Sequence, residues 1–152
     1  MMMIGKMKLL VLSVVTLLIS VVSAAIPFKE CDGKTHVKGV GVLGCTVAPC
    51  TLKRGTNATI EVDFVADTAA TQLKAVVHGI IGGIPIPFTP PNTNGCVDSG
   101  INCPVATGKS YKYSNKIPVL TNYPKIRLVV KYELVNEKSQ SMFCVELPAQ
   151  IQ

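Results

Sequence analysis

Alternation of apolar and polar residues is the sequence feature that most limits what this chain can fold into. In one segment, Ile60, Val62 and Phe64 are separated by two acidic residues. The same alternation occurs in three further segments, at residues 73–78, 126–135 and 142–147. A period of two residues is typical of β-strands with one buried face. Clusters of Gly, Pro and Asn separate the segments, which indicates turns between strands.

No stretch after residue 25 keeps the 3.6-residue period of an amphipathic helix. About seven short strands in roughly 127 residues therefore predict an all-β domain, built as an antiparallel β-sandwich. The inward-facing positions collect Ile, Leu, Val, Phe and Tyr. We see no internal repeat and no linker, so residues 26–152 are expected to form one domain.

The first 25 residues read as a secretory signal peptide. Lys6 and Lys8 precede an apolar run from Leu9 to Val22, and small residues follow at 23–25. This order of charge, short apolar core and small residues is that of a cleaved signal. The alternative is a transmembrane anchor, which needs about 20 apolar residues, whereas the run from Leu9 to Val22 has only 14. We expect cleavage after Ala24 or Ala25 and a secreted protein without a membrane span.

Six cysteines follow the predicted signal, and an even number in a small secreted domain indicates disulfides. The short spacings favour one bridge from Cys45 to Cys50 and another from Cys96 to Cys103. Cys31 and Cys144 are then left to join the two ends of the domain. The competing interpretation, a zinc site, lacks any Cys-x-x-Cys pair, so we expect no metal.

Composition and motifs exclude several functional classes. Hydrophobic residues make up 48% of the chain and charged residues 16%, which excludes a disordered polyelectrolyte. The net charge is +6, but the basic residues are dispersed, so nucleic-acid binding is not predicted. The two histidines belong to no nucleophile or metalloprotease motif. We therefore expect neither an enzyme nor a cofactor.

The segment from Ile84 to Pro91 is apolar but contains four prolines. Proline cannot donate to a strand ladder, so this segment must lie at a sheet edge or leave the sheet. Apolar side chains on such stiff edges suit the lip of an opening between two sheets, and ligand pockets have mostly apolar walls. Two interpretations stay open from the residues alone, a lipid pocket and ordinary edge strands.

Several longer motifs resemble the ML lipid-recognition family, in particular its soluble Niemann-Pick type C sterol-transfer branch. The resemblance covers the whole chain after the predicted signal, including all six cysteines. The motifs that carry it are Lys74-Ala75-Val76-Val77-His78-Gly79-Ile80, Ile84-Pro85-Ile86-Pro87-Phe88, Ser99-Gly100-Ile101-Asn102-Cys103-Pro104, Tyr111-Lys112-Tyr113, Asn115-Lys116-Ile117-Pro118-Val119, Tyr123-Pro124-Lys125-Ile126 and Ser141-Met142-Phe143-Cys144.

The resemblance implies a seven-stranded immunoglobulin-like β-sandwich with three disulfides and a lipid cavity between the sheets. It places the family's pocket positions at Phe88, Val119, Tyr123 and Pro124, with Ile86 beside them. Two pocket positions that are tryptophan in the vertebrate sterol carrier correspond to Tyr132 and Val145. The implied ligand is cholesterol, a related sterol or another apolar lipid, held without cofactor or covalent chemistry.

The resemblance also implies partners and a destination. The carrier transfers its lipid to a membrane surface or to a membrane-bound sterol transporter, acts as a monomer, and works outside the cell or in the lysosome lumen. A turn at Ile80, Ile81 and Ile84 is a candidate docking surface, since exposed apolar patches mark interaction sites. Asn57-Ala58-Thr59 is a sequon for N-glycosylation.

Two other functions use the same pocket. One is innate-immune recognition of bacterial lipid A or a related glycolipid, and the other is carriage of fatty acids or semiochemicals, as in invertebrate members of the family. Lipid A would require cations for its phosphates near the entrance, where the sequence places Lys116 and Lys125.

Overall fold

The computed structural model describes residues 26–152, so the predicted signal peptide at residues 1–25 lies outside the described residues. Nine strands follow one another in this described part of the chain: β1 (Lys29–Glu30), β2 (Val37–Val42), β3 (Cys50–Leu52), β4 (Thr56–Val65), β5 (Leu73–Ile81), β6 (Ile84–Phe88), β7 (Ser110–Val119), β8 (Arg127–Asn136) and β9 (Ser141–Ile151). Seven of them have five or more residues, and β1 and β3 are short additions. Within residues 26–152, no helix has the length and hydropathy to cross a membrane.

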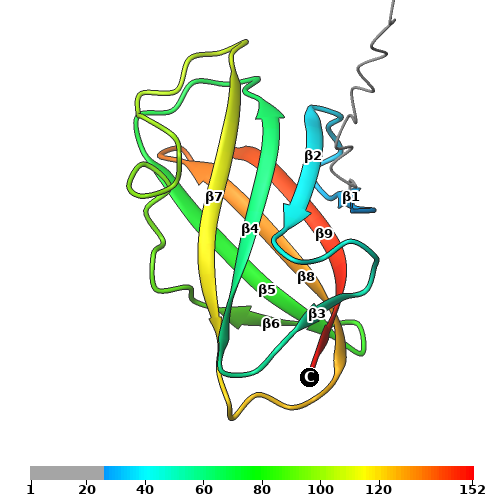
Figure 1. The fold of residues 1–152 in the computed structure, drawn as a ribbon. Helices are drawn as coiled ribbons and strands as arrows, with labels where there is room; N and C mark the ends of the chain where they lie inside the picture. The colour runs from blue at the N-terminus through cyan, green and yellow to red at the C-terminus, as the bar shows by residue number, and fades with distance from the viewer. Residues whose placement is uncertain (1–25) are drawn as a thin grey trace, which may run out of the picture.

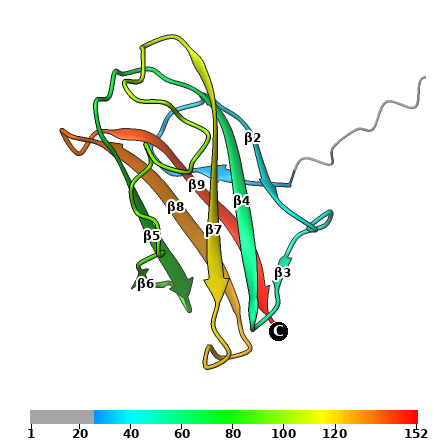
Figure 2. The same cartoon turned by 60° about the vertical axis from the view of Figure 1, so that its left-hand side comes forward.

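Two sheets face each other, as Figures 1 and 2 show. The larger sheet has the order β1-β9-β8-β5-β6, and β3 joins it by pairing with β9. The smaller sheet has the order β2-β4-β7. Nearly all pairings are antiparallel, and the exception is the short parallel pairing of β3 with β9. The structure thus confirms the predicted all-β sandwich.

Alternation in the sequence becomes alternation of burial in the strands. In β4, Ile60, Val62 and Phe64 are buried, whereas Asp63 is exposed. Strand β9 departs from the pattern because four consecutive residues, Met142 to Val145, are buried. The register between β8 and β9 shifts here and passes over Met142, which is the extra residue of a β-bulge.

The proline-rich segment forms β6, which lies at an edge of the larger sheet and, among the strands of residues 26–152, pairs only with β5. This confirms the expectation that its prolines keep it out of a sheet interior. A two-residue turn, Gly82-Gly83, joins β5 to β6, and both glycines have positive φ, at 57° and 82°. Tight hairpin turns of this kind require that conformation, which glycine adopts without steric cost.

All three predicted disulfides are present. Cys45 is bonded to Cys50, Cys96 to Cys103, and Cys31 to Cys144. The last bridge spans 113 residues and fastens the segment around β1 to β9. The chain-entropy estimate for a loop of that length is about 4–5 kcal/mol of stabilisation.

The two ends of the sandwich are filled differently. At one end, aromatic side chains from both sheets pack together, with ring centroids of Phe64 and Phe143 5.1 Å apart and those of Tyr113 and Tyr132 5.7 Å apart. The opposite end is where β7 and β9 finish and where β4 and β8 begin, near the C-terminus in Figure 2. The aromatic cluster thus closes the core at the first end.

Candidate functional site

A cavity of about 390 Å³ lies between the two sheets, at the end opposite the aromatic cluster. Its walls come from both sheets and from the loop between β7 and β8, residues 120–126, which we call the lip loop. The lining is formed by Val42, Leu52, Ala58, Ile60, Val77, His78, Gly79, Ile81, Ile86, Pro87, Phe88, Ile117, Pro118, Val119, Tyr123, Pro124, Ile126, Leu128, Val130, Tyr132, Leu147, Ala149 and Ile151. Nearly all of these residues are apolar, so the cavity suits a ligand with little polar surface.

The positions of the lining residues show how the cavity is oriented. Tyr132 belongs to the aromatic cluster, and Val77 lies opposite it in the β5–β8 register, so these two residues mark the inner end. Ile86 is 47% exposed, and Pro87 of β6 and Pro124 of the lip loop are also exposed. The mouth therefore lies between β6 and the lip loop.

Two aromatic rings meet across this mouth. The ring of Phe88 on β6 and the ring of Tyr123 on the lip loop have centroids 6.1 Å apart and an interplanar angle of 81°. Aromatic pairs favour this edge-to-face arrangement, which contributes about 0.5–1.5 kcal/mol beyond area burial. Partial burial raises the pKa of the Tyr123 hydroxyl. Tyr123 is thus neutral at physiological pH and presents an uncharged group at the entrance.

A small polar network backs the inner end of the cavity. The hydroxyl groups of Tyr113 and Tyr132 are 2.7 Å apart, and the amide Nδ2 of Asn115 donates to the Tyr132 hydroxyl at 2.8 Å. The same Nδ2 also donates to the Asn92 carbonyl at 3.0 Å. Burial in this apolar surrounding raises the pKa of both tyrosine hydroxyls, because desolvation disfavours their charged form. The network therefore fixes the Tyr132 ring as an uncharged inner wall.

The structure brings together six of the seven residues predicted to bind ligand. Ile86, Phe88, Val119, Tyr123, Pro124 and Tyr132 all line the cavity. Val145 does not: it is fully buried in the core cluster and lies directly opposite Tyr132 in the β8–β9 register. The aromatic cluster occupies the space on that side, so Val145 is a core residue in the structure.

Sequence reasoning missed a large part of the lining. Leu128 and Val130 of β8 and Leu147 and Ala149 of β9 line the cavity on the larger sheet. The alternation predicts that Leu128, Val130 and Leu147 face inward, but it cannot distinguish a cavity wall from a filled core. The signal that separates them is the position along the strand, which becomes known only when the strand ends are placed.

The three isoleucines predicted to dock do not share one surface. Ile84 is 66% exposed at the start of β6, whereas Ile81 is half-buried and lines the cavity. Ile80 is half-buried in a shallow groove on the outside of the larger sheet, beside Pro49 and Arg127. Docking stays a prediction, and the geometry limits it to the part of the turn that carries Ile84. The sequon residue Asn57 is exposed on β4, and its glycosylation also stays a prediction.

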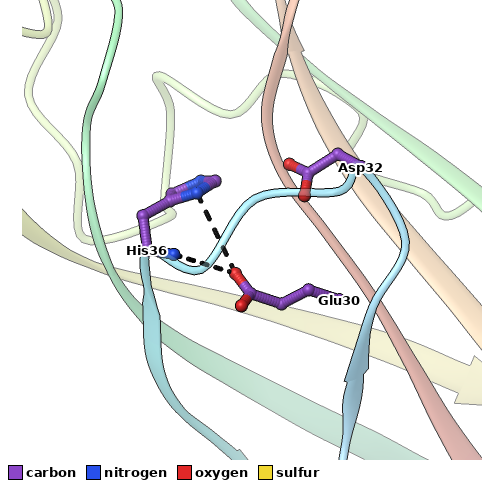
Figure 3. Close-up of side chains that lie close together, drawn as sticks. All are labelled: Glu30, Asp32 and His36. Atoms are coloured by element: carbon purple, nitrogen blue, oxygen red, sulfur yellow. Dashed lines mark hydrogen bonds and ion pairs between the residues drawn. The ribbon is translucent and has the colours of Figure 1, made fainter.

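A second group of polar side chains lies near the beginning of the chain (Figure 3). A carboxylate oxygen of Glu30, a carboxylate oxygen of Asp32 and a ring nitrogen of His36 lie within 4.8 Å of one another. The Glu30 carboxylate already accepts hydrogen bonds from the backbone N–H groups of His36 at 3.1 Å and Val37 at 2.9 Å. Asp32 accepts from the Lys34 N–H and the Ser141 hydroxyl. These bonds give the cluster a structural role in holding the β1–β2 connection.

Comparison with known proteins identifies the family. The family model described as the ML domain matches residues 25–151. The chain is 42% identical over 134 residues to the bovine NPC intracellular cholesterol transporter 2, covering 88% of this chain and 89% of the bovine protein. It is also 42% identical to NPC intracellular cholesterol transporter 2 homolog a of Drosophila melanogaster, covering 87% and 91%.

Solved structures share the fold. The Niemann-Pick type C2 protein of the Japanese carpenter ant matches with a TM-score of 0.76 at 23% identity, over 83% of this chain and 99% of the ant protein. Chicken MD-1 complexed with lipid IVa matches with a TM-score of 0.52 at 19% identity, over 78% and 83%. The family model and the relatives agree over nearly all of the described residues, and the chain belongs to the ML domain family.

Proposed function

We propose that the protein is a carrier that binds a sterol or a similar apolar lipid in the cavity between its sheets. The observation that carries this proposal is an apolar cavity of about 390 Å³ between the two sheets, open at one end of the sandwich. The side chains that line an empty apolar space lack packing partners on one side. A ligand that fills the space supplies those contacts.

The relatives support the choice of ligand. The bovine and Drosophila proteins, both 42% identical to this chain, are named as cholesterol transporters. The lining matches a sterol, since a rigid hydrocarbon skeleton needs apolar walls and at most a single polar contact. The Tyr123 hydroxyl at the mouth is an uncharged partner for such a polar end. We infer reversible carriage without chemistry, in a secreted protein that works outside the cell or in the lysosome lumen.

Transfer to a membrane or to a membrane-bound sterol transporter belongs to the same proposal. The mouth between β6 and the lip loop is the side that must face the acceptor, because the ligand leaves there. The exposed Ile84 and Ile86 lie on β6 beside the mouth. We expect the carrier to act as a monomer, since one chain supplies every wall of the cavity.

The test is to identify the lipid directly. Protein purified from its native source is extracted with organic solvent, and the extract is analysed by mass spectrometry. A stoichiometric sterol is the expected result. If the extract instead contains a stoichiometric fatty acid, semiochemical or glycolipid, that lipid is the ligand of the cavity and the sterol assignment is wrong. A lipid-free protein that also fails to bind a fluorescent sterol in titration would refute the carrier function.

A further inference from the structure

The lip loop is attached to the rest of the protein by few hydrogen bonds. Its two ends are fixed, because Gly55 N–H donates to the Val119 carbonyl just before the loop, and Ile151 N–H donates to the Ile126 carbonyl. Between these points, residues 121–125 form one backbone hydrogen bond within the loop, from Tyr123 N–H to the Leu120 carbonyl at 3.2 Å. The segment that carries Tyr123 and Pro124 would therefore depend on side chains from elsewhere for its position.

One side chain supplies those contacts. The Nη1 nitrogen of Arg54 donates to the carbonyl of Thr121 at 3.1 Å and to the carbonyl of Tyr123 at 3.3 Å. Within residues 26–152, it is the only group outside the loop that donates hydrogen bonds to residues 121–125. Hydrogen bonds from a charged donor are about twice as strong as those between neutral groups.

Arg54 is itself held in place by the larger sheet. Its backbone N–H donates to the main-chain oxygen of Gln152 at 2.8 Å, and the Gln152 N–H donates to the Leu52 carbonyl at 2.9 Å. The arginine thus extends from a backbone that is tied to the end of β9. None of the ion pairs among the described residues involves Arg54, so no carboxylate competes for its guanidinium.

The loop that Arg54 holds forms one side of the cavity mouth. Tyr123 on this loop meets Phe88 on β6 edge to face, with centroids 6.1 Å apart. A rigid lipid that passes between β6 and the lip loop must separate these two rings. Separation requires the loop to move away from β6, and the two Arg54 hydrogen bonds oppose any movement that displaces the carbonyls of Thr121 and Tyr123.

We propose that Arg54 is a positioning residue that holds the lip loop over the cavity and thereby sets the rate at which a lipid enters and leaves. This inference rests on the proposed carrier function. Arg54 does not line the cavity, so it acts on the ligand through Tyr123 and Pro124. If opening limits both entry and exit, loss of the two hydrogen bonds accelerates both steps to a similar degree and changes the equilibrium affinity little.

The experiment compares Arg54→Met with wild type by stopped-flow mixing with a fluorescent sterol. We expect association and dissociation rate constants to rise by roughly tenfold, which is about 1.4 kcal/mol, while the dissociation constant changes less than about threefold. Arg54→Lys keeps a charged donor and should restore part of the slow exchange. Lys53→Met removes the same charge from the neighbouring exposed residue and should leave both rates unchanged.

Hydrogen exchange measured by mass spectrometry on a peptide covering residues 120–126 tests the same contacts without ligand. Faster exchange is expected in Arg54→Met and not in Lys53→Met. Unchanged exchange of this peptide, unchanged sterol kinetics in Arg54→Met, or equal acceleration by Lys53→Met would each overturn the role of Arg54. If wild type binds no sterol, the carrier function fails, and the hydrogen-exchange comparison still decides whether Arg54 positions the loop. Arg54→Gln, which keeps a neutral donor, replaces the Met variant if that variant does not fold.

Discussion

Enlarging Val119 to phenylalanine separates a cavity wall from a filled core. Val119 ends β7, is 5% exposed and lines the cavity. The larger side chain can extend into the cavity, where it meets empty space or a displaceable ligand. Val62 provides the matched control, because it lies in β4 of the same sheet, is 0% exposed, and belongs to the core cluster without lining the cavity.

The expected magnitudes differ clearly between the two sites. Overpacking a filled core costs about 1–3 kcal/mol. For a domain of this size, each kcal/mol lowers the melting temperature by about 3–5 °C, so Val62→Phe should melt about 3–15 °C below wild type. Val119→Phe should shift the melting temperature of the apoprotein by less than about 3 °C, because its extra atoms displace no side chain.

Binding should show the opposite order. In Val119→Phe the added ring occupies ligand volume, so affinity for a fluorescent sterol should fall at least about hundredfold, or about 2.7 kcal/mol. Val62→Phe should retain binding in its folded fraction. Differential scanning calorimetry of delipidated protein, followed by equilibrium titration with the sterol, measures both quantities. A Val119→Phe protein that melts as early as Val62→Phe yet still binds sterol would show that Val119 faces a filled core.

Three further perturbations test other parts of the structure. Tyr123→Phe should weaken sterol binding by less than about tenfold, because the ring and its contact with Phe88 remain, and a larger loss in the same titration would mean that the hydroxyl is the main ligand contact. Replacing both Cys31 and Cys144 by serine should lower the free energy of unfolding in urea by about 4–5 kcal/mol, and a change below about 1 kcal/mol would contradict the loop-closure argument. The raised pKa of the buried Tyr113 hydroxyl makes the free energy of unfolding depend on pH. The pKa of this hydroxyl is about 10 in the unfolded chain and higher in the folded protein. The stabilisation from neutral Tyr113 is therefore complete below about pH 10 and is lost as the pH rises further. Between about pH 9 and 11, the free energy of unfolding measured in urea should therefore fall less in Tyr113→Phe than in wild type. An equal fall in both proteins would show that other groups cause the pH dependence.

Much of the fold could be predicted from local patterns. A period of two fixes which side chains of β4, β5 and β8 face inward, since successive side chains of a strand point to opposite faces. Proline chemistry places β6 at an edge because its residues cannot complete a ladder on both sides. Short spacings select two of the disulfides, and the third follows from the cysteines that remain. These inferences need only geometry that neighbouring residues impose on one another.

The site required information that no local pattern contains. Resemblance to the family assigned Val145 to the pocket, but it packs against the aromatic cluster, because where the cavity ends depends on how side chains from both sheets fill the space between them. Met142 and Phe143 are consecutive and both lie in the core, since a single bulge changes which face a residue occupies. Arg54 has no sequence signature at all. Its hydrogen bonds join residues 67 and 69 positions apart, so only the tertiary fold, which brings the end of β9 and the lip loop together, gives this arginine its place at the mouth of the cavity.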